Sequence, residues 1–179
     1  MKMASSALDE IDPGTTVFVD STIFVYHFTG ASADCRLFLA RCESGDIKAV
    51  TSVVVLAEVA HRLMMAEALA GRHVSPGNMP AKLRRKPDVV RSLHIYQEQV
   101  ERIPLLCIEV LPLTWPDLLA SAALRERHGL LVNDSLIAAT ALKRGVRAIA
   151  SADGDFERVV ELSLFRPADI GSALQEPTR

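Results

Sequence analysis

The chain has 179 residues, which fits one domain of ordinary size, and 49% of them are hydrophobic, enough for a continuous core. Its hydrophobic runs are far shorter than the roughly 18 residues that span a bilayer, so the composition excludes a membrane-spanning protein. The formal net charge is only −2, so the chain as a whole is neither strongly basic nor strongly acidic.

The cysteines and the N-terminal residues favour a soluble, cytoplasmic protein. Cys35, Cys42 and Cys107 include no pair spaced like a zinc knuckle or a redox CxxC motif, so we expect buried, reduced thiols. Residues 1–10 lack the hydrophobic stretch of a secretory signal.

Residues 1–14 are expected to be a flexible N-terminal tail, because they end in the turn sequence Asp12-Pro13-Gly14. From there, short runs of β-branched residues alternate with longer helical segments, which is typical of βαβ units and a parallel sheet. We expect strands at residues 16–19, 47–50, 106–110 and 146–150. We expect helices at residues 21–28, 33–43, 52–69, 88–102, 115–128 and 135–144.

Residues 71–87 are expected to form an irregular insertion between two helices. Pro76, Pro80 and Pro87 stand there with Gly71 and Gly77, and both residue types disfavour continuous secondary structure. The folded domain is therefore predicted over residues 15–170, with a flexible C-terminal tail at residues 171–179.

The insertion also carries most of an uneven charge distribution. Residues 71–91 contain six basic side chains and one acid, Asp88, which leaves 14 basic and 21 acidic residues elsewhere, a balance of −7. A basic segment on an acidic body fits a polyanionic partner, although a solvated loop explains the charge equally well. No aromatic residue interleaves the cluster, so base stacking is not indicated. The candidate residues for binding such a polyanion are Arg72, Lys82, Arg84, Arg85 and Lys86.

Four carboxylates lie where hydrophobic runs end or turn into helices: Asp20, Glu58, Asp134 and Asp153. In a parallel sheet, Asp20 and Asp153 would follow neighbouring strands and Asp134 would open a helix over the same edge. If the fold brings all four together, two such charges about 4 Å apart repel by roughly 4 kcal/mol at a protein-like dielectric. A divalent cation would resolve that repulsion.

Helix capping is a structural explanation for three of these acids. Asp20, Asp134 and Asp153 all stand at possible helix starts, where an Asp cap contributes about 1 kcal/mol. Glu58 lies more than a turn inside its helix, although an ion pair with Arg62 four residues later would account for it. The interpretations are compatible, because a cap at the carboxyl end of a parallel strand lies where open α/β sheets bind ligands.

The donor set of this acidic cluster consists of oxygens only, and no histidine or cysteine stands at ligand spacing. Such a set selects Mg²⁺ or Mn²⁺ over zinc or copper. An ion of this kind activates water and steadies the oxygens of a phosphodiester, so the expected chemistry is phosphoryl hydrolysis. Ser21, Asn133 and Ser151 lie within two residues of the acids, either as turn and cap residues or as hydrogen-bond partners of the ligands.

Other motifs are weaker. Glu58-Val59-Ala60-His61 has the Glu-x-x-His spacing of di-iron bundles but no second copy. The Asp-x-Asp pair of aspartyl-phosphate phosphatases belongs after the first strand, where the sequence is Asp20-Ser21-Thr22. No glycine-rich phosphate-binding loop is present.

Four stretches resemble, in their order along the chain, the PIN-domain nucleases, and in particular the VapC-type toxins of toxin–antitoxin pairs. These stretches are residues 17–24, 51–59, 129–141 and 149–156, which include the four acids. Together they span nearly the whole chain between the two predicted tails. The chain departs from compact members mainly through the insertion at residues 71–87.

This resemblance implies a three-layer α/β/α sandwich around a central parallel sheet. It maps the catalytic and metal-binding roles onto Asp20, Glu58, Asp134 and Asp153, with Asp155 and Ser151 as further contributors. It also implies Mg²⁺ or Mn²⁺ as cofactor, an RNA substrate, a cognate antitoxin and a homodimer.

We therefore expect a metal-dependent endoribonuclease in which a metal-activated water hydrolyses RNA phosphodiester bonds. Two alternatives remain open. One is a catalytically inactive PIN-fold binding or scaffold module, whose acids only cap helices and pair with arginines. The other is a small Mg²⁺-dependent phosphatase.

Overall fold

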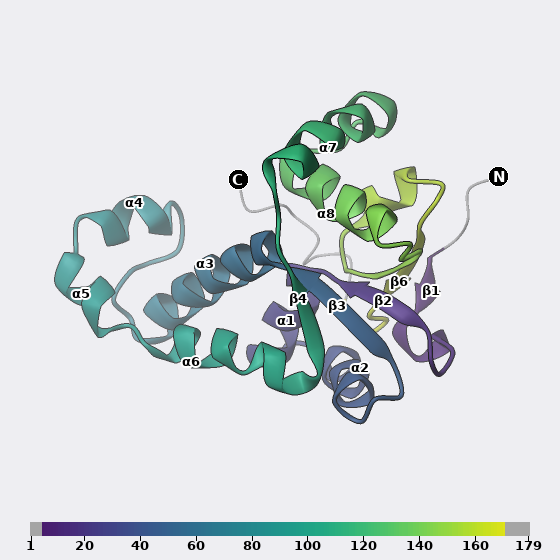
Figure 1. The fold of residues 1–179 in the computed structure, drawn as a ribbon. Helices are drawn as coiled ribbons and strands as arrows, with labels where there is room; N and C mark the ends of the chain where they lie inside the picture. Colours follow the sequence, from purple (N-terminus) through teal and green to yellow (C-terminus); the bar gives the residue numbers. More distant parts are fainter. Residues whose placement is uncertain (1–4, 171–179) are drawn as a thin grey trace.

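The computed structural model describes residues 5–170, which form a three-layer α/β/α sandwich (Figure 1). Its sheet has six strands in the order β1-β6-β5-β2-β3-β4, and every neighbouring pair is parallel. The strands are β1 (Ser6–Ala7), β2 (Thr16–Val19), β3 (Lys48–Ser52), β4 (Ile108–Leu111), β5 (Ala148–Ala150) and β6 (Ser163–Arg166). The expected fold class is confirmed.

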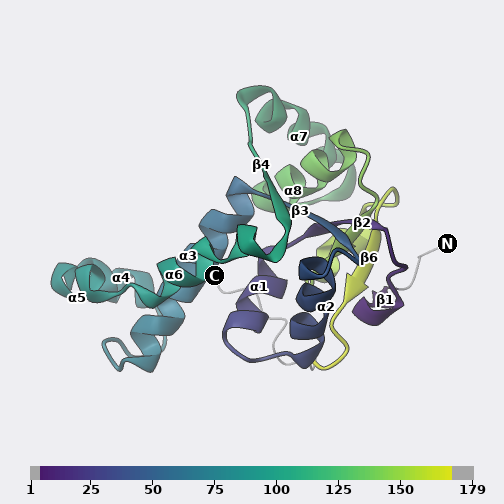
Figure 2. The same ribbon diagram turned by 60° about the horizontal axis from the view of Figure 1, so that its bottom comes forward.

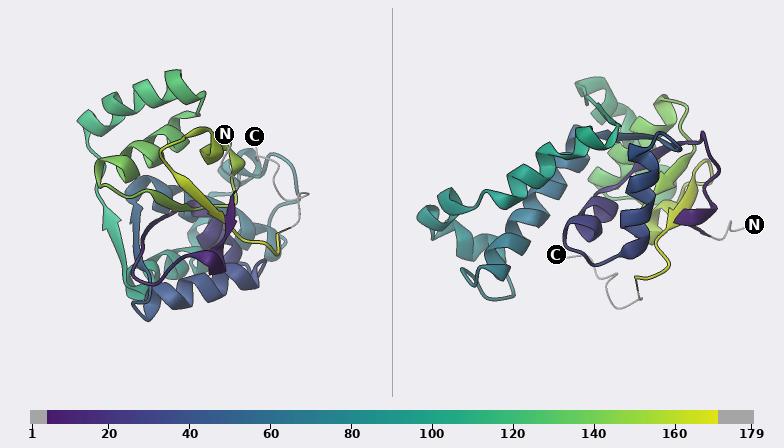
Figure 3. Two further views of the ribbon diagram at one scale, coloured as in Figure 1. Left: turned by 90° about the vertical axis from the view of Figure 1, so that its right-hand side faces the viewer. Right: turned by 90° about the horizontal axis from the view of Figure 1, so that it is seen from below.

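Helices cover both faces of the sheet. The α-helices are α1 (Ser21–Phe28), α2 (Ala33–Glu43), α3 (Val53–Ala70), α4 (Met79–Arg84), α5 (Pro87–Ser92), α6 (Ile95–Glu101), α7 (Trp115–His128) and α8 (Val132–Lys143). Short 3₁₀ helices are η1 (Leu8–Glu10), η2 (Ile103–Leu106) and η3 (Gly154–Arg158). Helices α1 and α2 lie on one face, and α8 lies on the other with α7 packed against it (Figure 3).

The two central strands form the middle of the core. Val17, Phe18 and Val19 of β2 are fully buried, as are Ile149 and Ala150 of β5. Strands of a parallel sheet are covered on both faces, so they read as continuous hydrophobic runs rather than alternating ones. The same runs therefore fix where β2 and β5 end, and so where Asp20 and Asp153 lie.

Residues 5–14, part of the predicted flexible N-terminal tail, instead supply an edge of the sheet. Strand β1 pairs with β6 through Ser6 and Phe165, and the side chains of Leu8 and Ile11 are buried. Burial of these two side chains offsets the entropy cost of ordering the segment. Neither β1 nor β6 was predicted, because β1 has only two residues and β6 contains no β-branched residue. Residues 1–4 and the predicted tail at residues 171–179 lie outside the described residues.

The single helix predicted at residues 88–102 is instead divided into α5 and α6. Leu93 lies between them in an extended conformation, with its side chain buried. The Glu67 carboxylate of α3 accepts hydrogen bonds from the backbone N–H groups of His94, Ile95 and Tyr96, at 3.0, 3.2 and 2.9 Å. Because one carboxylate satisfies three donors that a continuous helix would use internally, a new helix begins there.

Residues 71–94, here called the arm, project from the sandwich beyond the end of α3 (Figures 1 and 2). The insertion predicted to be irregular thus contains α4 and leads into α5. A small second core holds the arm against α3, and its buried members are Met65, Ala68, Val74, Leu83 and Leu93. Hydrophobic burial therefore gives the arm a defined structure.

Two other expectations can be compared with the structure. Within residues 5–170, no helix combines the length and the hydropathy needed to span a bilayer. Cys35 and Cys42 are buried free thiols as expected, but Cys107 is exposed. Its exposure follows from its place in the turn between η2 and β4, where its φ is +57°.

Candidate active site

Asp20 and Asp153 lie at the carboxyl ends of neighbouring parallel strands. Val19 of β2 is paired with Ala150 of β5, and the Asp20 N–H continues the ladder by donating to the Ala150 carbonyl at 3.0 Å. Asp20 comes directly after β2, and Asp153 comes three residues after β5. The edge where parallel strands end is where open α/β sheets bind ligands.

Glu58 and Asp134 reach the same edge from helices on either side of it. Helix α3 starts directly after β3 and carries Glu58 in its second turn. The Ser21 hydroxyl, at the start of α1, donates to Glu58 Oε1 at 2.9 Å. Asp134 is the third residue of α8, and α8 contacts α3. The two helix starts thus bring these acids toward Asp20 and Asp153.

The Asp20 carboxylate is buried and held in one orientation. Asp20 is only 4% exposed. Oδ2 accepts hydrogen bonds from the Thr22 N–H at 3.3 Å, the Thr22 hydroxyl at 2.8 Å and the Ser151 hydroxyl at 2.7 Å. Within residues 5–170 the other oxygen, Oδ1, accepts no hydrogen bond, so one carboxylate oxygen remains available to a ligand.

Thr22 is a site residue that sequence reasoning missed. Its hydroxyl donates to Asp20 and accepts from the Ala152 N–H at 2.9 Å. The Ser151 hydroxyl likewise donates to Asp20 and accepts from the Asp153 N–H at 3.0 Å. Two hydroxyls therefore tie Asp20 to the segment that carries Asp153. In the sequence, Thr22 is two residues from Asp20, the same spacing as that between Ser151 and Asp153. That spacing could have identified Thr22 as a candidate.

The electrostatics show that the acids act on one another. Burial raises the pKa of the Asp134 carboxyl to about 7, and the charges of Asp153, Asp20, Asp155 and Glu58 add to the shift. Such mutual repulsion requires proximity, because exposed charges more than about 10 Å apart are largely screened.

Glu58 shows the same behaviour with partial compensation. Burial is the largest cause that raises its pKa, and the Asp20 charge is the second. The Ser21 hydrogen bond and the Arg62 guanidinium act in the opposite direction. Arg62 Nη1 lies 3.8 Å from Glu58 Oε1, longer than a hydrogen bond, so this ion pair only partly offsets the repulsion.

Helix capping accounts for two of the four acids. Asp20 caps α1 through the Thr22 N–H, and Asp153 caps η3 by accepting from the Asp155 N–H at 2.8 Å. Asp134 caps nothing, because α8 begins three residues earlier than predicted and its N-cap is Leu131. Capping therefore does not explain Asp134, whose pKa is raised to about 7 and whose side chain forms no hydrogen bond or ion pair within residues 5–170.

Of the remaining predicted site residues, some lie in the hydrogen-bond network and others do not. Ser21 and Ser151 lie in the hydrogen-bond network, as described above. Asp155 adds negative charge near Asp134, and its own Oδ1 pairs with Arg158 Nη2 at 2.9 Å. Asn133 is exposed, and its side chain makes no hydrogen bond within the described part of the chain. The structure therefore does not place Asn133 in the network.

The donors at this edge fit a hard divalent cation. They are carboxylate oxygens that repel one another, and hydroxyls of Ser21, Thr22 and Ser151 orient two of them. Among residues 5–170, no three acid, histidine or cysteine side chains are arranged to hold an ion as they stand. The four acids lie at one edge of the sheet and repel one another, so a divalent cation bound there would offset that repulsion.

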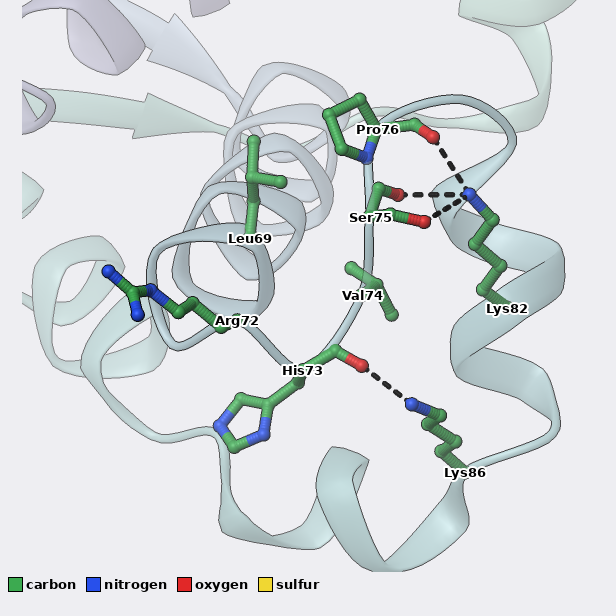
Figure 4. Close-up of a pocket in the computed structure, with 8 residues that line it drawn as sticks. All are labelled: Leu69, Arg72, His73, Val74, Ser75, Pro76, Lys82 and Lys86. Carbon is green, nitrogen blue, oxygen red and sulfur yellow. Dashed lines mark hydrogen bonds between the residues drawn. The ribbon is translucent and has the colours of Figure 1, made fainter.

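The five basic candidates lie on the arm and not at the acidic edge. Helix α3 carries Glu58 near its start and leads into the arm at its end. Arg72, Lys82 and Lys86 line an open hollow of about 540 Å³ on the arm (Figure 4). The structure therefore separates a basic surface from the acidic one and joins them by one helix.

Comparison with known proteins relates the chain to one protein family. The family model described as the PIN domain matches residues 17–162. The chain is similar to Ribonuclease VapC6 of Methanocaldococcus jannaschii, with 22% identity over 159 residues, 85% of this chain and 97% of that relative.

Two solved structures share the fold. One is VapBC2 from Rickettsia felis bound to a DNA fragment from its promoter, with a TM-score of 0.54 and 18% identity over 85% of this chain and 98% of that one. The other is a toxin–antitoxin complex from Klebsiella pneumoniae, with a TM-score of 0.53 and 19% identity over 86% and 99% of the two chains.

Proposed function

The chain belongs to the PIN domain family, and from that premise we propose that it is a metal-dependent endoribonuclease and the toxin of a toxin–antitoxin pair. The convergence of four carboxylates at one edge of the sheet carries the proposal, because each of the other three contributes to raising the pKa of Asp134. Nothing in folding alone requires that arrangement. The name of the similar ribonuclease supports RNA as the substrate.

The residues that would hold the ion are Asp20, Glu58, Asp134 and Asp153. Asp155 would join them if its carboxylate turned away from Arg158. All are oxygen donors, which favours Mg²⁺ or Mn²⁺. A bound ion of this kind supplies a water nucleophile of lowered pKa and offsets charge that develops on the phosphodiester oxygens.

The chain's own residues supply the orientation. Thr22 and Ser151 hold Asp20 through Oδ2, which would leave Oδ1 for a ligand, and Ser21 holds Glu58 through Oε1. Near neutral pH, the raised pKa of Asp134 leaves part of the population protonated at that carboxyl in the metal-free protein. Ion binding would then release this proton to solvent.

Thr22→Val should weaken the binding of Mn²⁺ by about 10- to 100-fold, the range seen when hydrogen-bond partners of metal ligands are removed. The valine keeps the shape of the side chain but removes the hydroxyl that orients Asp20 and satisfies the Ala152 N–H. Isothermal titration with Mn²⁺ measures the effect. Thr22→Ser restores the hydroxyl and should bind within a few-fold of wild type; equal losses in both variants would contradict the positioning role.

The proposed activity is tested with purified protein and a labelled RNA of mixed sequence. We expect internal cleavage in Mg²⁺ or Mn²⁺, none in EDTA, and little action on DNA of the same sequence or on p-nitrophenyl phosphate. Hydrolysis of the phosphate monoester without RNA cleavage would favour the phosphatase, and no hydrolysis of any substrate would favour a binding module.

The partner proteins follow from the same proposal. One of the two similar solved structures is described as a toxin–antitoxin complex, and the other as VapBC2 bound to a DNA fragment from its promoter. We expect a cognate antitoxin that inhibits cleavage, and a homodimer in solution. Induced expression of the chain in the cytoplasm should arrest growth, and co-expression of the antitoxin should relieve the arrest.

A further inference from the structure

The basic residues of the arm differ in what they bind. Lys82 Nζ donates to the Ser75 carbonyl, the Ser75 hydroxyl and the Pro76 carbonyl at 3.1, 2.9 and 2.8 Å, and Lys86 Nζ donates to the His73 carbonyl at 2.7 Å (Figure 4). These bonds hold the loop at residues 73–76 against α4. The acceptors are neutral, so both lysine side chains keep a positive charge that no acid offsets. All three N–H donors of Lys82 Nζ, however, are already engaged in these hydrogen bonds.

Three arginines of the arm remain without a partner. Arg91 pairs with Asp88, the single acid of the segment. Arg72, Arg84 and Arg85 are exposed, and within residues 5–170 their side chains form no hydrogen bond or ion pair. These three are called the arm arginines below. A free guanidinium presents a fork of donors that matches a phosphate group.

The arm holds these arginines on an ordered scaffold. Val74 and Leu83 are buried in its small core, and Glu67 joins the end of the arm to α3 through three backbone hydrogen bonds. Less conformational entropy is lost on binding when the contacting surface is already formed. The arm is thus better suited to bind a ligand than a solvated loop would be.

The length of α3 gives the distance between the acidic edge and the start of the arm. Helix α3 runs without interruption from Glu58 to Ala70, the residue before the arm. At 1.5 Å per residue, these twelve steps span about 18 Å. A stacked nucleic-acid strand rises about 3.4 Å per nucleotide, so the same distance corresponds to about five nucleotides.

We propose that the arm arginines form a second RNA-binding surface, which contacts backbone phosphates at least about five nucleotides from the cleaved bond. The inference rests on the proposed ribonuclease function. An RNA chain can reach both surfaces because one helix joins them. The rest of the chain carries a balance of −7, so the attraction for a polyanion comes from the arm. Residues 71–94 contain no Phe, Tyr or Trp, so the contact is to the backbone and independent of sequence.

The test measures RNA binding in EDTA, where no cleavage takes place, by the fluorescence anisotropy of a labelled 20-nucleotide RNA over a range of salt concentrations. A triple variant replaces the arm arginines with Gln. A matched control replaces three exposed arginines outside the arm, Arg36, Arg102 and Arg147, with Gln. Thermal unfolding of both variants checks that they fold.

The arm variant should bind RNA at least tenfold more weakly than wild type. The slope of log affinity against log salt should fall by about two, since each phosphate contact on a single strand contributes about 0.7. The control should stay within about twofold of wild type. Unchanged RNA binding by the arm variant, an unchanged slope, or an equal loss in the control overturns the proposal.

Cleavage of a length series tests the distance. RNAs that keep fewer than about five nucleotides on one side of the cut should be cleaved more slowly by wild type, and the arm variant should lose that dependence. If the arm variant retains the full dependence on length, the proposed distance is wrong. If wild type cleaves no RNA at all in Mg²⁺, the proposed function fails, while the binding measurement still reports on the arm.

Discussion

Asp20→Asn should abolish Mg²⁺-dependent RNA cleavage, lowering the rate by at least about a thousandfold. A cation-binding carboxylate contributes several kcal/mol to stabilising the transition state, and each 1.36 kcal/mol is a factor of about ten. Asp20 is the acid with the most fixed orientation, with three donors on Oδ2. The substitution keeps the shape of the side chain and removes only its charge.

This variant also separates the two explanations of Asp20. Asn is as good an N-cap as Asp, so α1 should keep its cap and the free energy of unfolding should change by less than about 1 kcal/mol. If Asp20 acts only as a cap, cleavage survives the substitution. Cleavage by gel assay and thermal unfolding are measured on the same preparation, with Asp12→Asn, an exposed acid outside the site, as the control. Activity of Asp20→Asn near that of wild type would contradict the catalytic assignment.

Asp134→Asn should stabilise the metal-free protein above pH 7 while removing its activity. Burial and four neighbouring carboxylates raise the pKa of Asp134 from its usual value near 3.8 to about 7. The folded protein therefore binds the proton more tightly than the unfolded chain does. The stability linked to this proton is fully present below about pH 4 and is lost as pH rises through 7.

The neutral amide cannot lose that proton, so the variant avoids the penalty. We expect a gain of about 1 to 2 kcal/mol at pH 8 in EDTA, less than the pKa shift alone implies because solvent screens a half-buried group. Below pH 4 the two proteins should have nearly equal stability. Urea unfolding from pH 4 to 8 measures the difference. A variant less stable than wild type at pH 8 would show that Asp134 has a stabilising partner in the folded state.

The location of the acids could be predicted because it depends on local pattern. Hydrophobic runs fix the ends of β2 and β5, and the ends place Asp20 and Asp153. The role of Thr22 could not be predicted in the same way. Neighbouring strands were expected to carry Asp20 and Asp153, but the Thr22 hydroxyl meets the Ala152 N–H only because the register sets Val19 opposite Ala150, and register does not follow from sequence spacing.

The contacts of the arm could not be predicted from the sequence either. Six basic residues in a short segment suggested a uniform polyanion-binding surface, and the composition supports that suggestion. The folded structure decides which cations are free: Lys82 and Lys86 donate to carbonyls of the loop at residues 73–76, and Arg91 pairs with Asp88 within α5. The break at Leu93 has a similar cause, because Glu67, 26 residues earlier in the chain, supplies the cap that starts α6.

A crystal structure with Mn²⁺ bound, with anomalous scattering recorded from the metal, would locate the ion directly. We expect a peak between Asp20 and Asp134, with oxygens of Glu58 and Asp153 in the coordination sphere directly or through water, and no peak there in the Asp20→Asn variant. A strong peak elsewhere on the protein, with these four carboxylates still apart and solvated, would contradict the assignment of this edge as the metal-dependent active site.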